Sequence, residues 1–117
     1  MKPFDLVKEI VGKLEEKKAE NIVVLDLKRL TTLTDYFIIA TGTSFPHLKA
    51  LAREIVNQAK EKHSLVPLNP LPEGDDSWVL VDYQDCIVHL FLEESRQFYN
   101  LEELWFESKK VDIKTHG

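Results

Sequence analysis

The amino-acid sequence predicts a single-domain α/β (α+β) fold in which a mixed β-sheet is flanked by helices. Some segments place apolar residues at helical spacing, and others form short apolar runs rich in β-branched residues. These segments follow one another in the order α-β-β-α-β-β-α. With 117 residues, of which 44% are hydrophobic and 30% charged, the chain has the size and composition of one globular domain.

The first half of the chain is predicted to form two helices and two strands. Helical spacing predicts a helix over roughly residues 4–18, and the β-branched run at 22–27 predicts a strand. A nearly continuous apolar run at 36–41 is typical of a strand covered on both faces. Ser44 is then placed to cap a second helix, predicted over 44–62.

The second half is predicted to begin with a long loop and a β-hairpin. Residues 64–77 contain Pro67, Pro70, Pro72 and Gly74, which predict an irregular connection of a size that is often functional. The runs at 78–83 and 86–92 are separated by so few residues that a tight antiparallel hairpin follows. A strand, a helix and a strand in succession also predict that 36–41 and 78–83 are parallel.

The C-terminal part is predicted to be helical and then loose. Residues 93–106 indicate a short helical turn followed by another helix, and Asn100 with Glu103 resembles a capping box at the start of that helix. Residues 107–117 are weakly patterned. We therefore expect a domain over 1–106 and a C-terminal tail that can be disordered.

The charge of the chain favours a basic protein partner over nucleic acid. The chain has 15 Lys and Arg residues and 20 Asp and Glu residues, which give a net charge of -5. Proteins that bind nucleic acid neutralise its phosphates with a basic face. An acidic chain instead complements a basic protein surface.

The cysteine count and the hydropathy pattern predict a cytoplasmic location. Cys86 is the single cysteine, so the chain has no disulfide framework and fits a reducing compartment. No apolar run approaches the roughly 20 residues that cross a bilayer. The first residues include acidic side chains, unlike a secretory signal or an organelle transit peptide. We therefore expect a cytoplasmic protein that does not bind membranes.

One turn has the position of a nucleotide site but not its sequence. Residues 42–44 (Gly-Thr-Ser) join a strand to a helix, where backbone N–H groups can hold phosphate. The chain has only 4 glycines, and they form neither a P-loop nor a dinucleotide-binding fingerprint. A nucleotidyltransferase also needs paired carboxylates for magnesium, and the pair Glu73 and Asp75 lies in the predicted loop. We therefore expect a structural turn and no cofactor.

Two further candidate sites are also better explained by structure than by chemistry. Cys86 and His89 could be a nucleophile and its base, but residues three apart on a strand point to opposite faces. A small thiol in an apolar strand is usually inert filling. The 4 histidines have no ligand spacing with the cysteine or with each other, so no metal site is predicted.

Aromatic and acidic residues near the predicted hairpin and the C-terminal helices indicate a protein interface, since Trp and Tyr are enriched there as anchors. The aromatic residues are Trp78, Tyr83, Phe98, Tyr99, Trp105 and Phe106. The acidic residues near them are Glu73, Asp75, Asp76, Asp85, Glu93 and Glu94. An aromatic patch with an acidic border suits a basic protein surface.

Several blocks of residues occur in an order that is specific to one known family. They are Thr34–Ser44 (TDYFIIATGTS) with His47, Ala50 and Ala52; Glu73-Gly74; Trp78–Tyr83 (WVLVDY) with Asp85; Val88–Phe91 (VHLF); and Glu94, Arg96, Tyr99–Glu102 and Leu104-Trp105. From the first predicted helix to Trp105, the chain resembles the ribosomal silencing factors, also called the iojap family.

The resemblance implies a nucleotidyltransferase-like fold without the enzyme's catalytic acids, and hence no enzyme activity. Members of this family bind the fourteenth protein of the large ribosomal subunit. They thereby block its joining with the small subunit and repress translation when nutrients are scarce. Isolated members are often homodimers.

On the resemblance and on the aromatic and acidic pattern together, we predict a partner-binding surface. Its residues are Glu73, Trp78, Tyr83, Asp85, Glu94, Arg96 and Tyr99. Two alternatives stay open from the sequence. One is a nucleotide-binding or nucleotidyltransferase-like enzyme that uses residues 42–44, and the other is a factor for assembly of the large subunit that uses the same surface.

Overall fold

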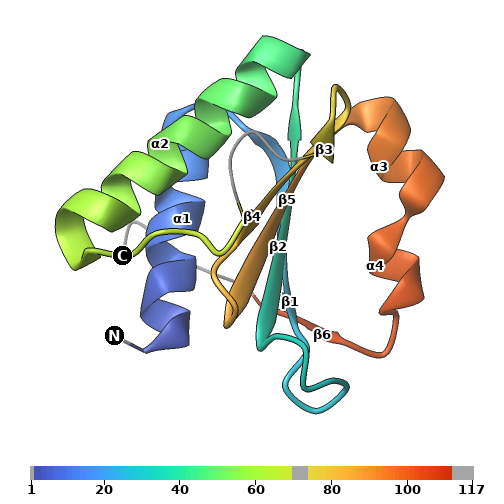
Figure 1. The fold of residues 1–117 in the computed structure, drawn as a ribbon. Coiled ribbons are helices and arrows are strands. Elements are labelled where there is room, and N and C mark those ends of the chain that lie inside the picture. Colours follow the sequence, from blue (N-terminus) through green and yellow to red (C-terminus); the bar gives the residue numbers. More distant parts are fainter. Residues whose placement is uncertain (1, 70–73, 112–117) are drawn as a thin grey trace.

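Helices cover both faces of the sheet (Figure 1). The structure, a computed structural model, describes residues 2–69 and 74–111. The helices are α1 (Pro3–Glu16), α2 (Phe45–His63), α3 (Glu93–Tyr99) and α4 (Leu101–Leu104). The strands are β1 (Glu20–Asp26), β2 (Tyr36–Gly42), β3 (Gly74–Asp75), β4 (Trp78–Asp82), β5 (Cys86–Leu92) and β6 (Lys109–Lys110). The predicted α+β class and the order of the long elements are confirmed.

The sheet is mixed, with the strand order β3-β4-β5-β2-β1-β6. Within the described residues β2 and β5 form its one parallel pair, and the other neighbours are antiparallel. The prediction that 36–41 is parallel to 78–83 was wrong. The hairpin turns back so that β5, not β4, lies beside β2, and β4 therefore runs antiparallel to β2. The hairpin itself was predicted correctly.

The predicted loop over 64–77 is less irregular than its prolines indicated. Gly74–Asp75 form β3, which pairs with the start of β4. Asn69 lies alongside β4. Its Nδ2 donates to the Leu80 carbonyl at 2.8 Å, and its Oδ1 accepts from the Asp82 N–H at 2.9 Å. Backbone groups on the outer side of β4 thus find partners in the segment that precedes it.

Two apolar cores fill the space between the three layers. α1 buries one stripe of side chains against the sheet, namely Leu6, Val7, Ile10, Val11 and Leu14. β2 is buried along its whole length, as predicted for a strand covered on both faces. Alternate residues of β2 belong to different cores: Ile38 packs on the α1–α2 side and Phe37 on the side of Trp105.

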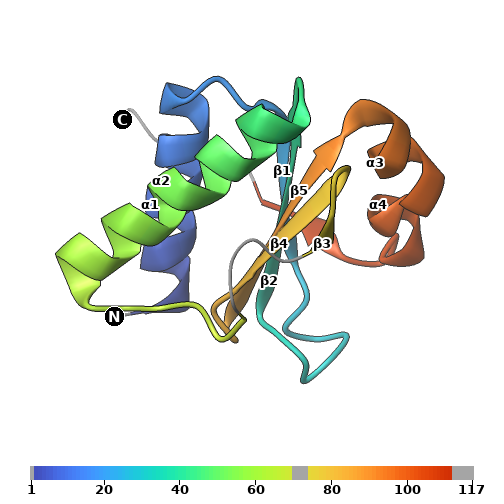
Figure 2. The same cartoon turned by 45° about the horizontal axis from the view of Figure 1, so that its top comes forward.

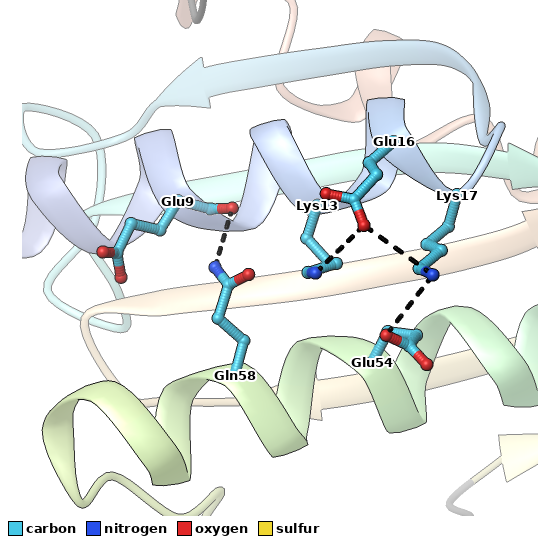
Figure 3. A network of polar contacts seen from close by, with 6 residues as sticks. All are labelled: Glu9, Lys13, Glu16, Lys17, Glu54 and Gln58. Atoms are coloured by element: carbon cyan, nitrogen blue, oxygen red, sulfur yellow. Dashed lines mark hydrogen bonds and ion pairs between the residues drawn. The ribbon is translucent and has the colours of Figure 1, made fainter.

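Polar contacts between α1 and α2 lie along the outer border of their packed faces (Figure 3). The Gln58 side chain donates to the Glu9 carbonyl at 3.3 Å, and Lys17 lies 3.8 Å from the Glu54 carboxylate. Such part-exposed pairs are each worth less than about 1 kcal/mol. The apolar stripe therefore accounts for most of the stability of this helix pair.

The start of α2 follows its sequence signals closely. Ser44 Oγ accepts a hydrogen bond from the His47 N–H at 3.2 Å, and a proline stands in the first turn, so the predicted cap is confirmed. Gly42 precedes it, and a Cβ there would lie 2.6 Å from Leu48 Cδ2. Glycine thus allows the strand end and the helix to approach closely.

The C-terminal segment differs from the sequence prediction at two places. Asn100 is left-handed, with φ 46°, and its side chain donates to the Glu103 carboxylate without capping the backbone, so the predicted capping box was wrong. The tail was expected to be loose from residue 107, but Lys109 and Lys110 pair with β1. Residues 112–117 lie outside the described part. Among the described helices, none has the length and apolar character needed to cross a membrane.

Candidate protein-binding surface

The outer side of α3, α4 and the turn that follows exposes large apolar side chains. The exposed fractions are 81% for Phe98, 44% for Tyr99, 69% for Leu104 and 75% for Phe106. This segment lies on the face of the sheet opposite α1 and α2 (Figure 2). Single exposed apolar residues are ordinary, whereas several in one short segment mark an interaction surface. We name these four residues the α3–α4 surface.

Trp78 supports this surface from the sheet. Its ring lies 4.7 Å from the Tyr99 ring and 4.8 Å from the Phe91 ring, measured between centroids. Phe98 meets Tyr99 edge-on at 5.1 Å. Aromatic rings at these separations attract one another beyond their apolar burial. Trp78 is half-buried, and the more exposed Tyr99 ring packs against it.

The segment that carries the α3–α4 surface is strongly acidic. Its acidic residues are Glu93, Glu94, Glu102, Glu103 and Glu107, and its one basic residue is Arg96. Arg96 Nε donates to the Glu102 carboxylate at 3.0 Å. The other four acidic residues are exposed. Carboxylates around apolar and aromatic side chains are complementary to a basic protein surface.

Arg96 is held inside the protein. It is 9% exposed, and its Nη1 donates to the Asn21 carbonyl at 2.6 Å and to Thr41 Oγ1 at 2.9 Å. With the Glu102 pair, these bonds tie α3 to α4, to β2 and to the start of β1. Arg96 therefore holds the α3–α4 segment on the sheet.

The structure separates two of the predicted interface residues from the others. Tyr83 and Asp85 follow the end of β4 that is remote from Trp78. Tyr83 packs into the core beside α1 and α2, and burial, with a smaller effect of Cys86, raises its pKa to about 12. Asp85 is exposed in the hairpin turn. Glu73 lies outside the described residues.

Trp78 contacts the Tyr99 ring, and Glu94 and Arg96 lie on the same helix as Tyr99. The structure also exposes apolar residues that the predicted interface omitted, in particular Leu104 and Leu30. A hollow of about 230 Å³ is lined by Leu30, Leu104, Trp105, Phe106 and Glu107. A signal was present: the run Leu101–Glu107 (LEELWFE) has more apolar residues than one short helical turn can bury.

The turn at residues 42–44 uses its polar groups within the chain. The Thr43 N–H donates to His47 Nδ1 at 3.0 Å, and His47 Nε2 donates to the Lys17 carbonyl at 3.0 Å. Because Nδ1 accepts, the ring proton is on Nε2. These bonds connect the end of α1 with the start of α2. They give the turn a structural role.

Cys86 and His89 lie on opposite faces of β5, as predicted. Cys86 packs beside α1 and α2, and burial raises its pKa well above the ordinary value, which keeps the thiol protonated and unreactive. His89 instead contacts the Trp78 ring. Over residues 2–69 and 74–111, no three metal-ligating side chains gather into a site.

Sequence comparison identifies relatives over almost the whole chain. A family model described as "Ribosomal silencing factor during starvation" matches residues 2–116. The "Ribosomal silencing factor RsfS" of Bacillus subtilis is 35% identical over 114 residues, which are 97% of this chain and 95% of that protein. "Protein Iojap, chloroplastic" of Arabidopsis thaliana is 34% identical over 90% of this chain, which spans 43% of that longer protein.

Solved structures have the same fold. A crystal structure of a protein from Chromobacterium violaceum matches with a TM-score of 0.84 and 31% identity, covering 99% of this chain and 97% of that one. A crystal structure from Bacillus halodurans matches with a TM-score of 0.77 and 30% identity, covering 93% and 98%. Sequence and fold therefore agree that the chain belongs to the RsfS/iojap family of ribosomal silencing factors, which are not enzymes.

Proposed function

We propose that this protein represses translation by binding the large ribosomal subunit through its fourteenth protein, which sterically blocks joining of the small subunit. The observation that carries the proposal is the α3–α4 surface. Its apolar side chains are exposed in the single chain, and acidic residues surround them. No other feature described above combines anchors and charge in this way.

The physical character of the surface fits a ribosomal protein. Proteins embedded in ribosomal RNA are rich in Lys and Arg, because they neutralise phosphates. Glu94 and Glu103 are exposed on α3 and α4 and would attract such a partner at long range. Phe98 and Tyr99 would then be covered in the complex, where aromatic residues contribute most of the binding free energy.

The test is cosedimentation of the purified protein with separated ribosomal subunits, followed by an assay of subunit joining. Phe98→Ala removes an exposed anchor without opening a core cavity. Leu68→Ala is a matched control, because Leu68 is also exposed and lies beside Tyr83, away from the surface. We expect Phe98→Ala to weaken large-subunit binding by tenfold or more and Leu68→Ala to leave it unchanged. Equal binding of both variants would contradict the assignment of the surface.

An assembly role is the second candidate. One relative, 35% identical over 82% of this chain, is a mouse protein named "Mitochondrial assembly of ribosomal large subunit protein 1". A silencing factor lowers the fraction of joined ribosomes while the large subunits stay complete. An assembly factor, when depleted, leaves incomplete large subunits. Sucrose-gradient profiles of depleted cells separate the two functions.

The proposal includes the state of the protein before it binds. We propose that it acts in the cytoplasm and is a homodimer when free, as in the family it resembles. Analytical sedimentation measures the mass of the free protein, and cell fractionation measures its location. A free protein that is monomeric at micromolar concentration would contradict the dimer without affecting ribosome binding.

A further inference from the structure

His89 has an unusual place for an ionisable side chain. It stands in the middle of β5 and is 5% exposed. Its ring centroid lies 4.4 Å from that of Phe37, 5.8 Å from that of Trp78 and 6.2 Å from that of Phe91. Burial lowers its pKa to about 4, so the ring is neutral at physiological pH. A phenylalanine would suit these apolar surroundings without burying any polar atom.

The hydrogen bonding of His89 explains why the ring is an imidazole. Its Nδ1 accepts from the Trp78 indole Nε1–H at 3.2 Å, and therefore its proton is on Nε2. That Nε2 is buried and has no partner among the described residues. A buried N–H without a partner is unfavourable. The ring thus keeps an unpaired donor on one side while its other nitrogen binds the indole of Trp78.

Trp78 links this buried contact to the exposed surface. The Tyr99 ring packs on the indole at 4.7 Å, and Phe98 packs on Tyr99 at 5.1 Å. The indole N–H and its acceptor therefore limit how the indole can rotate beneath Tyr99. Without the acceptor, stacking on Phe91 and Tyr99 would still hold the indole, but no directional contact would fix its rotation.

We propose that His89 is a positioning residue of the partner surface: it fixes the Trp78 indole, and through it Tyr99 and Phe98, in the arrangement that a protein partner binds. The inference rests on the proposed function, because it assigns a role within that binding surface. Aromatic anchors that are ordered before binding lose less conformational freedom in the complex. The buried hydrogen bond between Trp78 and His89 thereby increases affinity, although His89 itself does not contact the partner.

The test uses His89→Phe, Trp78→Phe and the double variant. His89→Phe keeps an aromatic ring and removes the Nδ1 acceptor together with the unpaired Nε2–H. We expect it to weaken large-subunit binding about fivefold, the scale of one net hydrogen bond. If His89 acts through the indole N–H, the double variant binds no more weakly than Trp78→Phe alone. The urea unfolding midpoint of each of the three variants checks that it is folded under the conditions of the binding assay.

Nuclear magnetic resonance gives a second readout that does not need the ribosome. In His89→Phe the Trp78 indole N–H should exchange faster with water, and its contacts to the Tyr99 ring should weaken. If His89→Phe does not fold, His89→Leu replaces it as the variant without an acceptor. His89→Asn is the rescue control, because its amide oxygen stands near the position of Nδ1. That variant should keep the indole signal and bind within twofold of the wild type.

The outcomes separate the two proposals. Wild-type protein that does not bind large subunits would overturn the proposed function, and the nuclear magnetic resonance data would still decide whether His89 orders Trp78 and Tyr99. Unchanged indole exchange in His89→Phe would overturn the positioning role. So would unchanged binding by that variant, or independent effects of the two substitutions on affinity.

Discussion

The Arg96 guanidinium joins α3 to the end of β2, since its Nη1 lies 2.9 Å from Thr41 Oγ1 although 55 residues separate the two in sequence. Thr41 is buried, so water cannot replace this contact. The same nitrogen donates to the Asn21 carbonyl. Two strands and two helices are therefore joined by one side chain, which holds the α3–α4 segment on the sheet.

Arg96→Ala should lower the free energy of unfolding by about 2–3 kcal/mol, because it leaves the Asn21 carbonyl and the Thr41 hydroxyl without their charged donor. Arg96→Lys should restore only part of the loss, since an ammonium cannot reproduce the guanidinium fork. The urea midpoint measures both effects, and the exposed Gln97→Ala serves as the control. Arg96→Ala with a normal midpoint but impaired ribosome binding would show instead that Arg96 contacts the partner.

Much of the fold was predictable because its signals are local. Ser44 caps α2 as its sequence position indicated, and the apolar run at β2 predicted burial on both faces. The hairpin between β4 and β5 also follows from the short spacing of two apolar runs. Each of these features depends on residues that are neighbours in the chain.

The features that could not be predicted depend on contacts between residues that are far apart in the sequence. Chain order does not tell which hairpin strand lies beside β2, because that choice depends on how both strands pack under the helices. The pairing of Lys109–Lys110 with β1 has no local signal in so short and charged a segment. At the candidate site, the aromatic and acidic character was predictable from composition. The internal bonds of Arg96 and the remote position of Tyr83 were not.

Ser44→Ala should lower the free energy of unfolding by about 0.5–2 kcal/mol through loss of the cap on α2. Ser44→Asp should restore stability, because a carboxylate also accepts from the His47 N–H and favours a helix N-terminus. Thermal or urea unfolding measures the difference. Ribosome binding should be normal in both variants. A stable Ser44→Ala protein that failed to bind would reassign the turn to the interface.

Trp78→Ala should affect both stability and binding. The indole is half-buried between Phe91 and Tyr99, so its removal should cost about 2–3 kcal/mol of stability, somewhat less than a fully buried tryptophan. Large-subunit binding by the folded variant should weaken by a further ~2 kcal/mol, since Tyr99 loses its support. Phe98→Ala should change binding alone. Normal binding by folded Trp78→Ala would show that Trp78 does not support the α3–α4 surface in binding.

Glu94→Lys should slow association with the large subunit and flatten its dependence on salt. Glu94 is exposed at the border of the α3–α4 surface, and border charges act on encounter more than on residence time. Glu61→Lys changes the net charge equally but lies on α2, across the sheet. Stopped-flow association at two salt concentrations compares the variants. Equal on-rates for both variants would show that only net charge matters. An unchanged on-rate for Glu94→Lys would show that the acidic residues around the α3–α4 surface do not steer association.

The stability of the protein should fall between pH 6.5 and pH 4 because of His89. Burial lowers the folded-state pKa of His89 to about 4, whereas an unfolded histidine titrates near 6.5. The unfolded chain therefore binds the proton first as the pH falls, and the stability contribution that is complete above pH 6.5 is lost through this range. By pH 5 the loss should be about 2 kcal/mol. Urea unfolding at pH 7 and pH 5 measures it, and His89→Phe should lack this component while keeping that of every other titrating group. An equal pH dependence in the variant would mean that His89 is protonated as readily in the folded protein as in the unfolded chain, and so is not shielded beneath Trp78.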